Sequence, residues 1–183
     1  MNFIDLVKKR TSIRKYLDKP IPRETLLRCV KAAQLAPSAC NAQPWNFIII
    51  DDKKTIKTVA EKICHTIYSF NKFISEAAAL VVVVSDKESF LRKAAGKIKG
   101  TDYYLIDIGI ACQHLILQAE ELGIGSCWIG WFDQKRLKKT LKLSKKSKVD
   151  IIISLGYYHP EAANSKPRKP LAQIASFYKP EKT

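Results

Sequence analysis

The sequence lacks the signals of several protein classes. Its longest apolar run, residues 77–84, is far shorter than the ~20 residues that cross a bilayer. Residues 1–10 contain no apolar core of a signal peptide. No G-x-G-x-x-G or G-x-x-x-x-G-K sequence follows an expected strand, so a Rossmann or P-loop nucleotide site is not supported. Without repeats or low-complexity blocks, we expect one soluble, intracellular, cytoplasmic domain over residues 1–183.

Cysteine and histidine are also scarce. The five cysteines are scattered and odd in number, which argues against a disulfide framework. No cysteine pair has C-x-x-C spacing, and the three histidines do not cluster with cysteines, so a zinc site is not expected. We therefore expect reduced and mostly buried thiols.

Acidic residues are few relative to basic ones, and the formal net charge is +15. Such a charge attracts nucleic acid, acidic lipid or a phosphorylated small molecule without choosing among them. The strongest basic run, residues 135–148, fits either a solvated helix face or a nucleic-acid footprint. Because no zinc-finger or RRM signature accompanies this run, the solvated face is the favoured interpretation.

The apolar pattern predicts irregularly alternating helices and strands, which indicates a mixed α+β sandwich. The run at 79–84, with four valines, predicts a strand covered on both faces. The segment 101–122 is apolar nearly all round, so it predicts a central helix or one shared with a second subunit, ended by Gly123. Further helices are expected at 1–10, 22–36, 53–65 and within 86–100 beside a mobile lysine-rich turn, strands at 45–50, 126–131 and 150–155, and a surface-wrapping tail from 157.

Two basic motifs could bind phosphate. R-T-S-I-R at 10–14 places Arg10, Ser12 and Arg14 on alternate positions, which point the same way in an extended segment. K-P-R-K-P-L at 166–171 offers a second cationic fork. Arginine forks match phosphate oxygens. The alternatives are basic residues favoured by the dipole at a helix end, and a solvated basic tail.

Two further motifs suit a planar ligand. A-P-S-A-C-N-A-Q-P-W at 36–45 combines small residues with Asn41 and Gln43, which both donate and accept hydrogen bonds as a flavin pyrimidine edge requires. G-I-G-S-C-W-I-G-W at 123–131 contains glycines that permit close backbone approach, and Gly130 could direct its N–H at a flavin N5. The alternatives are a proline-pinned loop and a glycine-rich turn entering a strand.

Together and in this order, the four motifs resemble the FMN-dependent nitroreductase family, from about residue 2 to 176. The resemblance implies an α+β sandwich with a central mixed, mainly antiparallel sheet flanked by helices. It also implies a homodimer with two FMN sites at the subunit interface, across which the 103–122 helix packs. One departure is that Ala39 stands where many relatives have a second serine.

The resemblance assigns site residues by matching position. Gly130 would supply the amide that faces N5, and Asn71 would reach the flavin pyrimidine. Five residues would surround the FMN phosphate, and a sixth would lie beside them. A second group, from the other subunit, would contact the flavin ring. The phosphate residues are Arg10, Ser12, Arg14, Lys166 and Arg168 with Thr11, and the ring residues are Pro37, Ser38 and Asn41, with Ala39 between them.

The implied function is an FMN-dependent oxidoreductase that passes reducing equivalents from NAD(P)H to a nitroaromatic, quinone or flavin by a ping-pong mechanism. The cofactor carries this chemistry, so no side chain is named as a nucleophile or general acid. Alternatives on the same fold are reductive dehalogenation and flavin cleavage. A basic nucleic-acid-binding module is a further alternative.

Overall fold

The computed structural model describes residues 1–85, 102–144, 146–163 and 166–179 of the 183-residue chain. The helix and lysine-rich turn expected at 86–100 lie outside these residues. Among the helices of the described part, none is long and apolar enough to cross a membrane.

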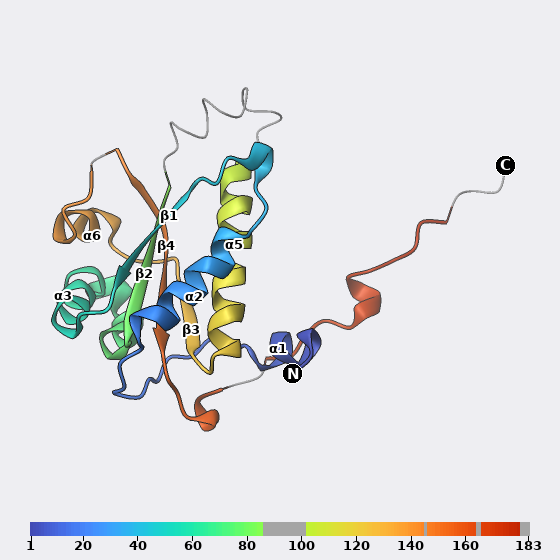
Figure 1. Ribbon diagram of the computed structural model, residues 1–183, viewed down its shortest axis with the longest axis horizontal. Coiled ribbons are helices and arrows are strands. Elements are labelled where there is room, and N and C mark those ends of the chain that lie inside the picture. The colour runs from blue at the N-terminus through green and yellow to red at the C-terminus, as the bar shows by residue number, and fades with distance from the viewer. Residues whose placement is uncertain (86–101, 145, 164–165, 180–183) are drawn as a thin grey trace.

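A four-stranded sheet forms the centre of the molecule (Figure 1). Its strands are β1 (Trp45–Ile50), β2 (Ala79–Ser85), β3 (Gly125–Ile129) and β4 (Lys148–Gly156), in the order β1-β2-β4-β3. Neighbouring strands are antiparallel. Ser12 adds a parallel bridge to Ser126 of β3, so the predicted mixed and mainly antiparallel sheet is confirmed.

The helices lie close to their expected positions. They are α1 (Phe3–Lys9), α2 (Arg23–Gln34), α3 (Lys53–Ile63), α5 (Tyr103–Glu121) and α6 (Gln134–Thr140). The sequence did not predict the 3-10 segment η2 (Thr66–Glu76) or the short turns η1 (Ala39–Asn41), η3 (Pro160–Ala162) and η4 (Leu171–Gln173). Caps explain three starts, because side-chain oxygens of Asn2, Asp52 and Asp133 accept a hydrogen bond from the backbone N–H three residues on, at α1, α3 and α6.

Helices cover both faces of the sheet, as the valine run predicted. Every residue of β2 is buried. Val81 and Val83 pack in one core with α2 and α5, whereas Val82 and Val84 pack in a second core with α3, η2 and α6. This alternation is the two-residue period of a strand. Each fully buried valine contributes roughly 1.5–3 kcal/mol relative to exposure, so this strand anchors the three layers.

Helix α5 is the central helix of its layer. Its buried residues recur in pairs at spacings of three and four, so its own chain covers one stripe of this helix rather than its whole apolar circumference. Gly123 follows it with φ 74°, a left-handed conformation that ends the helix at low steric cost, as predicted. Near its start, Tyr103, Leu105 and Ile106 remain exposed. This helix therefore has apolar surface that its own chain does not cover.

The C-terminal segment leaves the rest of the chain (Figure 1). All described residues from Lys166 to Lys179 are exposed, including Leu171, Ile174, Phe177 and Tyr178. We expected this tail to wrap over the surface, but most of it extends away from its own chain. Its apolar side chains therefore require another surface if they are to be buried.

Candidate functional site

The R-T-S-I-R segment runs along the edge of the sheet. Ile13 N donates a 2.9 Å hydrogen bond to the Ser126 carbonyl, and Ser12 bridges to Ser126. Ile13 is completely buried. In extended backbone its neighbours must face the opposite way, so Ser12 and Arg14 point away from the core. The predicted alternation therefore holds for these two residues.

A cationic cavity joins the two ends of the sequence. Its volume is about 630 Å³. Among the predicted phosphate residues, it brings together Arg10, Thr11, Lys166 and Arg168, but Ser12 and Arg14 do not line it. The complete lining is Val7, Lys8, Arg10, Thr11, Gln113, Ile116, Trp128, Lys166 and Arg168. Four of these side chains are cationic, and no carboxylate stands among them.

Two details of this cavity indicate an anionic ligand. Thr11 Oγ1 is buried and has no hydrogen-bond partner in the described part of the chain. Burial raises the pKa of the nearby Cys127 thiol, while the charges of Arg14, Lys166 and Arg10 oppose that rise. All three cations therefore lie close enough to act on one buried atom, which places Arg14 in the same positive field although it is not a lining residue.

Arg14 itself lies 6.0 Å from the centre of the Phe73 ring. The backbone behind it is fixed by Tyr16, whose hydroxyl donates to the Ile13 carbonyl at 2.8 Å and lies 2.7 Å from Ser154 Oγ. Burial raises the pKa of Tyr16 strongly, so this phenol remains protonated and keeps its hydrogen bonds. The basic segment is thus held by the core of the sheet.

The 37–41 loop has an unusual backbone. Cys40 and Asn41 both have φ 53°, and Gln43 follows with φ 46°. Such left-handed residues other than glycine cost of order 1 kcal/mol each and cluster at functional sites. Ser38 Oγ accepts a hydrogen bond from Gln43 N at 3.0 Å, which closes the loop. The sequence predicted the loop but not this strain.

A residue that the sequence analysis missed holds this loop. Asp107 of α5 is buried, and its Oδ1 accepts a 3.0 Å hydrogen bond from Ala39 N. Its Oδ2 has no hydrogen-bond partner in the described part of the chain. The available signal was composition, because Asp107 is an isolated acidic residue near the start of a helix that is otherwise uncharged until its last two residues.

Glu120, at the other end of α5, was missed in the same way. It is 1% exposed, and its Oε1 accepts a 2.8 Å hydrogen bond from the Tyr158 hydroxyl and pairs with Lys9 Nζ at 3.3 Å. Burial and this carboxylate raise the pKa of Tyr158. Glu120 therefore joins the end of α1, directly before Arg10, to α5 and the segment that leads to the tail.

The phosphate residues and ring residues do not meet within one chain. The cationic cavity touches α5 at Gln113 and Ile116, whereas the 37–41 loop touches α5 at Asp107. At about 100° per residue, Ile116 points roughly opposite to Asp107. None of Pro37, Ser38, Ala39 and Asn41 lines the cavity.

Asn71 and Gly130 do lie close together. Asn71 is buried in η2, and its Nδ2 donates a 2.7 Å hydrogen bond to the carbonyl of Trp131, the residue after Gly130. Strand β3 was expected to reach Trp131 but ends at Ile129, because Asn71 rather than a strand partner binds that carbonyl. Gly130 is exposed, so its backbone is accessible beside Asn71.

The thiols agree with the sequence analysis. All five cysteines are free, and four are buried. Burial raises the pKa of Cys29 to about 11 and of Cys112 to about 12, so these groups are inert thiols near neutral pH. Cys40 is the exposed exception, and it lies in the strained loop. No group of three or more potential metal ligands was found among the described residues.

Known proteins resemble this chain over most of its length. The sequence pattern of the nitroreductase family matches residues 7–157. A putative NADH dehydrogenase/NAD(P)H nitroreductase of Archaeoglobus fulgidus is 34% identical over 158 residues, which cover 84% of each chain. An iodotyrosine deiodinase of Thermotoga neapolitana is 28% identical, covering 95% of this chain and 96% of the deiodinase.

A solved structure shows the same fold. An FMN-dependent nitroreductase from Clostridium difficile R20291 superimposes with a TM-score of 0.75 at 30% identity, covering 97% of this chain and 99% of that one. The order of the motifs, the three-layer fold and these relatives agree. The chain belongs to the nitroreductase family.

Proposed function

We propose that this chain is an FMN-dependent oxidoreductase that transfers reducing equivalents from NAD(P)H to a small acceptor by a ping-pong mechanism. Nitroaromatics, quinones and flavins are the acceptor classes. The observation that carries the proposal is the cationic cavity, which collects basic residues from both ends of the sequence and has no carboxylate among its described lining residues. The named relatives supply the cofactor and the nicotinamide donor by analogy.

In this proposal the FMN phosphate lies in the cationic cavity. Arg10 and Arg168 would donate paired hydrogen bonds to its oxygens, and Lys166 would add a further charge. Thr11 Oγ1 is a buried donor in need of an acceptor, which a phosphate oxygen provides. Ser12 and Arg14 would approach from the adjoining edge of the sheet.

The ring contacts would come from a second copy of the chain. Pro37, Ser38, Ala39 and Asn41 approach α5 from a different side than the cavity does, which suits a homodimer with two sites at its interface. The exposed apolar residues of the α5 start and of the tail supply surface for such an interface. Phe177, for example, is 96% exposed in the single chain.

Bound FMN would accept and donate hydride equivalents, as flavins do. The chain would position the reacting partners. Asn71 fixes the Trp131 carbonyl and with it the backbone at Gly130, whose N–H would face flavin N5. Because Asn71 Nδ2 is engaged there, its Oδ1 would accept from the pyrimidine. Beside them, Phe70 and Trp131 form an exposed edge-to-face pair with ring centres 6.2 Å apart, a surface suited to planar acceptors.

An absorbance titration tests the proposal. The purified protein should carry, or take up, one FMN per chain, and NADH or NADPH should bleach the flavin band anaerobically without any acceptor present. Adding a quinone should then restore the band, which is the signature of a ping-pong reaction. A colourless protein that takes up no FMN supplied in excess would overturn the proposal.

Reductive dehalogenation is a second candidate, because the Thermotoga neapolitana relative is named an iodotyrosine deiodinase. Turnover with a halogenated phenol under anaerobic conditions separates the two reactions. Halide release at a rate comparable to nitroaromatic reduction would favour the dehalogenase. Flavin cleavage, a third alternative, predicts loss of flavin absorbance during turnover with oxygen. The relatives give no support for a nucleic-acid-binding module.

A further inference from the structure

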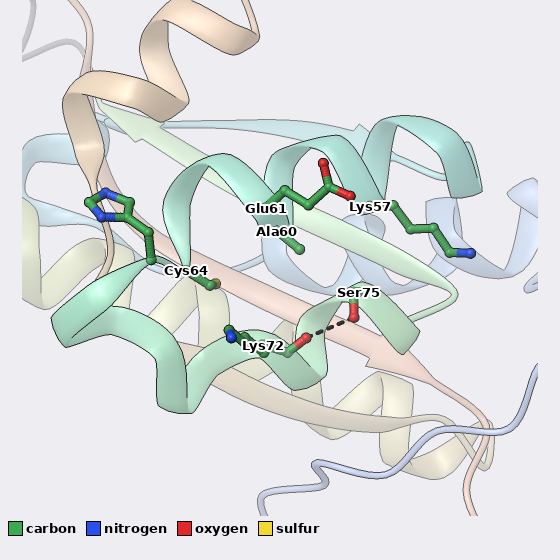
Figure 2. Close-up of a pocket in the computed structure, with 7 residues that line it drawn as sticks. Lys57, Ala60, Glu61, Cys64, Lys72 and Ser75 are labelled. Carbon is green, nitrogen blue, oxygen red and sulfur yellow. Dashed lines mark hydrogen bonds between the residues drawn. The ribbon is translucent and has the colours of Figure 1, made fainter.

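A second pocket lies beside α3 and η2 (Figure 2). These elements pack in the core on the other face of the sheet from α5, which lines the cationic cavity. The second pocket is a groove of about 580 Å³ between α3 and η2, in the size range of small-molecule sites. One wall is a helical stripe at spacing i, i+3, i+4, i+7, and the other wall belongs to η2. The lining is Lys57, Ala60, Glu61 and Cys64 on the first wall, with His65 beyond it, and Lys72 and Ser75 on the second.

The floor of this groove is apolar. Ala60 and Cys64 are 3% and 2% exposed, so they belong to the core that underlies the groove. The wall of η2 is fixed locally, because Ser75 Oγ donates a 2.8 Å hydrogen bond to the Lys72 carbonyl (Figure 2). From Lys57 to Cys64 the α3 wall is about 10 Å long at 1.5 Å per residue. An aromatic ring or short acyl chain fits this length.

Charge on the walls selects the ligand further. Burial raises the pKa of Cys64 to about 11, and the Lys72 ammonium opposes that rise, so this ammonium lies near the floor. Lys57 adds a second positive charge at the other end of the α3 wall, whereas Glu61 adds a negative one (Figure 2). Two cations against one carboxylate favour a single negative charge over a polyanion.

The layer that surrounds the groove also has a net positive charge. The segments 53–76 and 133–143, which contain α3, η2 and α6, hold ten lysine and arginine residues and three acidic ones. On the opposite face, helices α2 and α5 together hold three basic residues and four acidic ones. The layer that contains the groove is therefore strongly positive and attracts anions at long range, as the basic N-terminal segment and tail do at the cationic cavity.

We propose that the groove between α3 and η2 binds a small monoanion with an apolar body, of the aromatic or acyl carboxylate or sulfonate class. The groove shares no lining residue with the cationic cavity. The proposal therefore stands independently of the flavin assignment.

The test uses 4-bromobenzenesulfonate, a monoanion with an apolar ring and a bromine that anomalous diffraction can locate. Calorimetric titration into FMN-saturated protein should show one site per chain with submillimolar affinity, and soaked crystals should show bromine between α3 and η2. The neutral 4-bromobenzenesulfonamide should bind at least about fivefold more weakly, since it lacks the charge that the lysines attract. If the protein takes up no FMN, the same titration is run on it as purified.

Three single-charge variants at exposed positions give the sharpest outcome. Lys72→Gln should weaken binding about threefold to tenfold, and Glu61→Gln should tighten it about twofold to fivefold. Lys31→Gln makes the same charge change as Lys72→Gln on α2, on the opposite face of the sheet, and should leave affinity unchanged. Bromine found only at another site, equal affinity in all three variants, or no binding at all would each overturn the proposal.

Discussion

At the scale of single residues, Arg168 and Lys169 offer a matched pair. They are neighbours with the same charge, and Arg168 lines the cationic cavity whereas Lys169 does not. If Arg168 binds the FMN phosphate, Arg168→Ala should weaken FMN binding roughly 10- to 100-fold, the range for a charge-assisted hydrogen bond of ~1.5–3 kcal/mol. Lys169→Ala should change it little. Equilibrium dialysis or fluorescence titration measures both.

Riboflavin is the control for this prediction, because it lacks the phosphate. Its affinity should be nearly the same in the native protein and in Arg168→Ala. An equal loss of riboflavin and FMN binding would show that Arg168 acts on folding or on the ring, and would contradict the phosphate assignment.

Asp107 is the residue on which the shape of the 37–41 loop depends. Asp107→Leu removes the acceptor of the Ala39 N–H and leaves that group unsatisfied, at a cost of about 1–3 kcal/mol. Asp107→Asn keeps an oxygen acceptor. We expect hydrogen exchange at the Ala39 amide to accelerate at least about tenfold in Asp107→Leu and to change little in Asp107→Asn. FMN affinity should likewise fall more in Asp107→Leu than in Asp107→Asn. Unchanged exchange in Asp107→Leu would contradict this role.

At the scale of elements, Asp133 begins α6. Its Oδ1 accepts from Arg136 N at 2.9 Å, and its Oδ2 lies 3.0 Å from His65 Nε2. The Arg136 N–H and His65 lower the pKa of this carboxyl. Asp133→Ala should reduce the free energy of unfolding by about 1 kcal/mol at pH 7, as for other N-cap replacements. Urea denaturation measures this difference.

The pH dependence of that difference has a definite sign. A carboxyl whose pKa is lower in the folded state stabilises the fold above its ordinary pKa of ~3.9, and this contribution disappears as the pH falls through the lowered value. The difference in the free energy of unfolding between the native protein and Asp133→Ala should therefore become smaller below about pH 4. Asp133→Asn, an uncharged cap, should show much less of this dependence. A difference that grows with acidification would contradict the assignment.

Elements with strong periodic patterns were predictable from the sequence. Strand β2 is buried on both faces, so its uninterrupted apolar run identified it, and the length of its predominantly apolar segment identified helix α5. Segment η2 was not predicted, since a 3-10 segment lacks the 3.6-residue pattern by which helices are recognised. The end of β3 was misplaced because a side chain distant in sequence, Asn71, binds the carbonyl of Trp131.

At the scale of the molecule, the sequence predicted four basic or polar residues that the fold brings to one cavity, but not the arrangement of the other predicted site residues. Charge and fork geometry identified Arg10 and Arg168, and the fold brings them to one cavity. Asp107 and Glu120 could not be identified in this way, since their importance depends on burial and on partners from distant segments. In the proposed homodimer, the position of the 37–41 loop relative to the cavity would depend on a second chain, which no pattern within one sequence describes.

The homodimer can be tested at the exposed start of α5. Ile106 is 50% exposed there, beside Tyr103 and Leu105. If this face packs against a second chain, Ile106→Glu places a charge in an apolar interface and should weaken association at least about tenfold, since an unpaired buried charge is costly. Light scattering across a dilution series should show the native dimer and a largely monomeric variant.

FMN retention should fall together with the dimer, because the 37–41 loop would reach the flavin from the other subunit. Thr58→Glu introduces the same charge at an exposed position of α3, on the opposite side of the sheet, and should leave both association and FMN retention unchanged. A native monomer that holds one FMN per chain would contradict the shared site, because all ring contacts would then have to come from the chain that binds the phosphate. A dimeric Ile106→Glu variant with unchanged FMN retention would instead place the interface on another face.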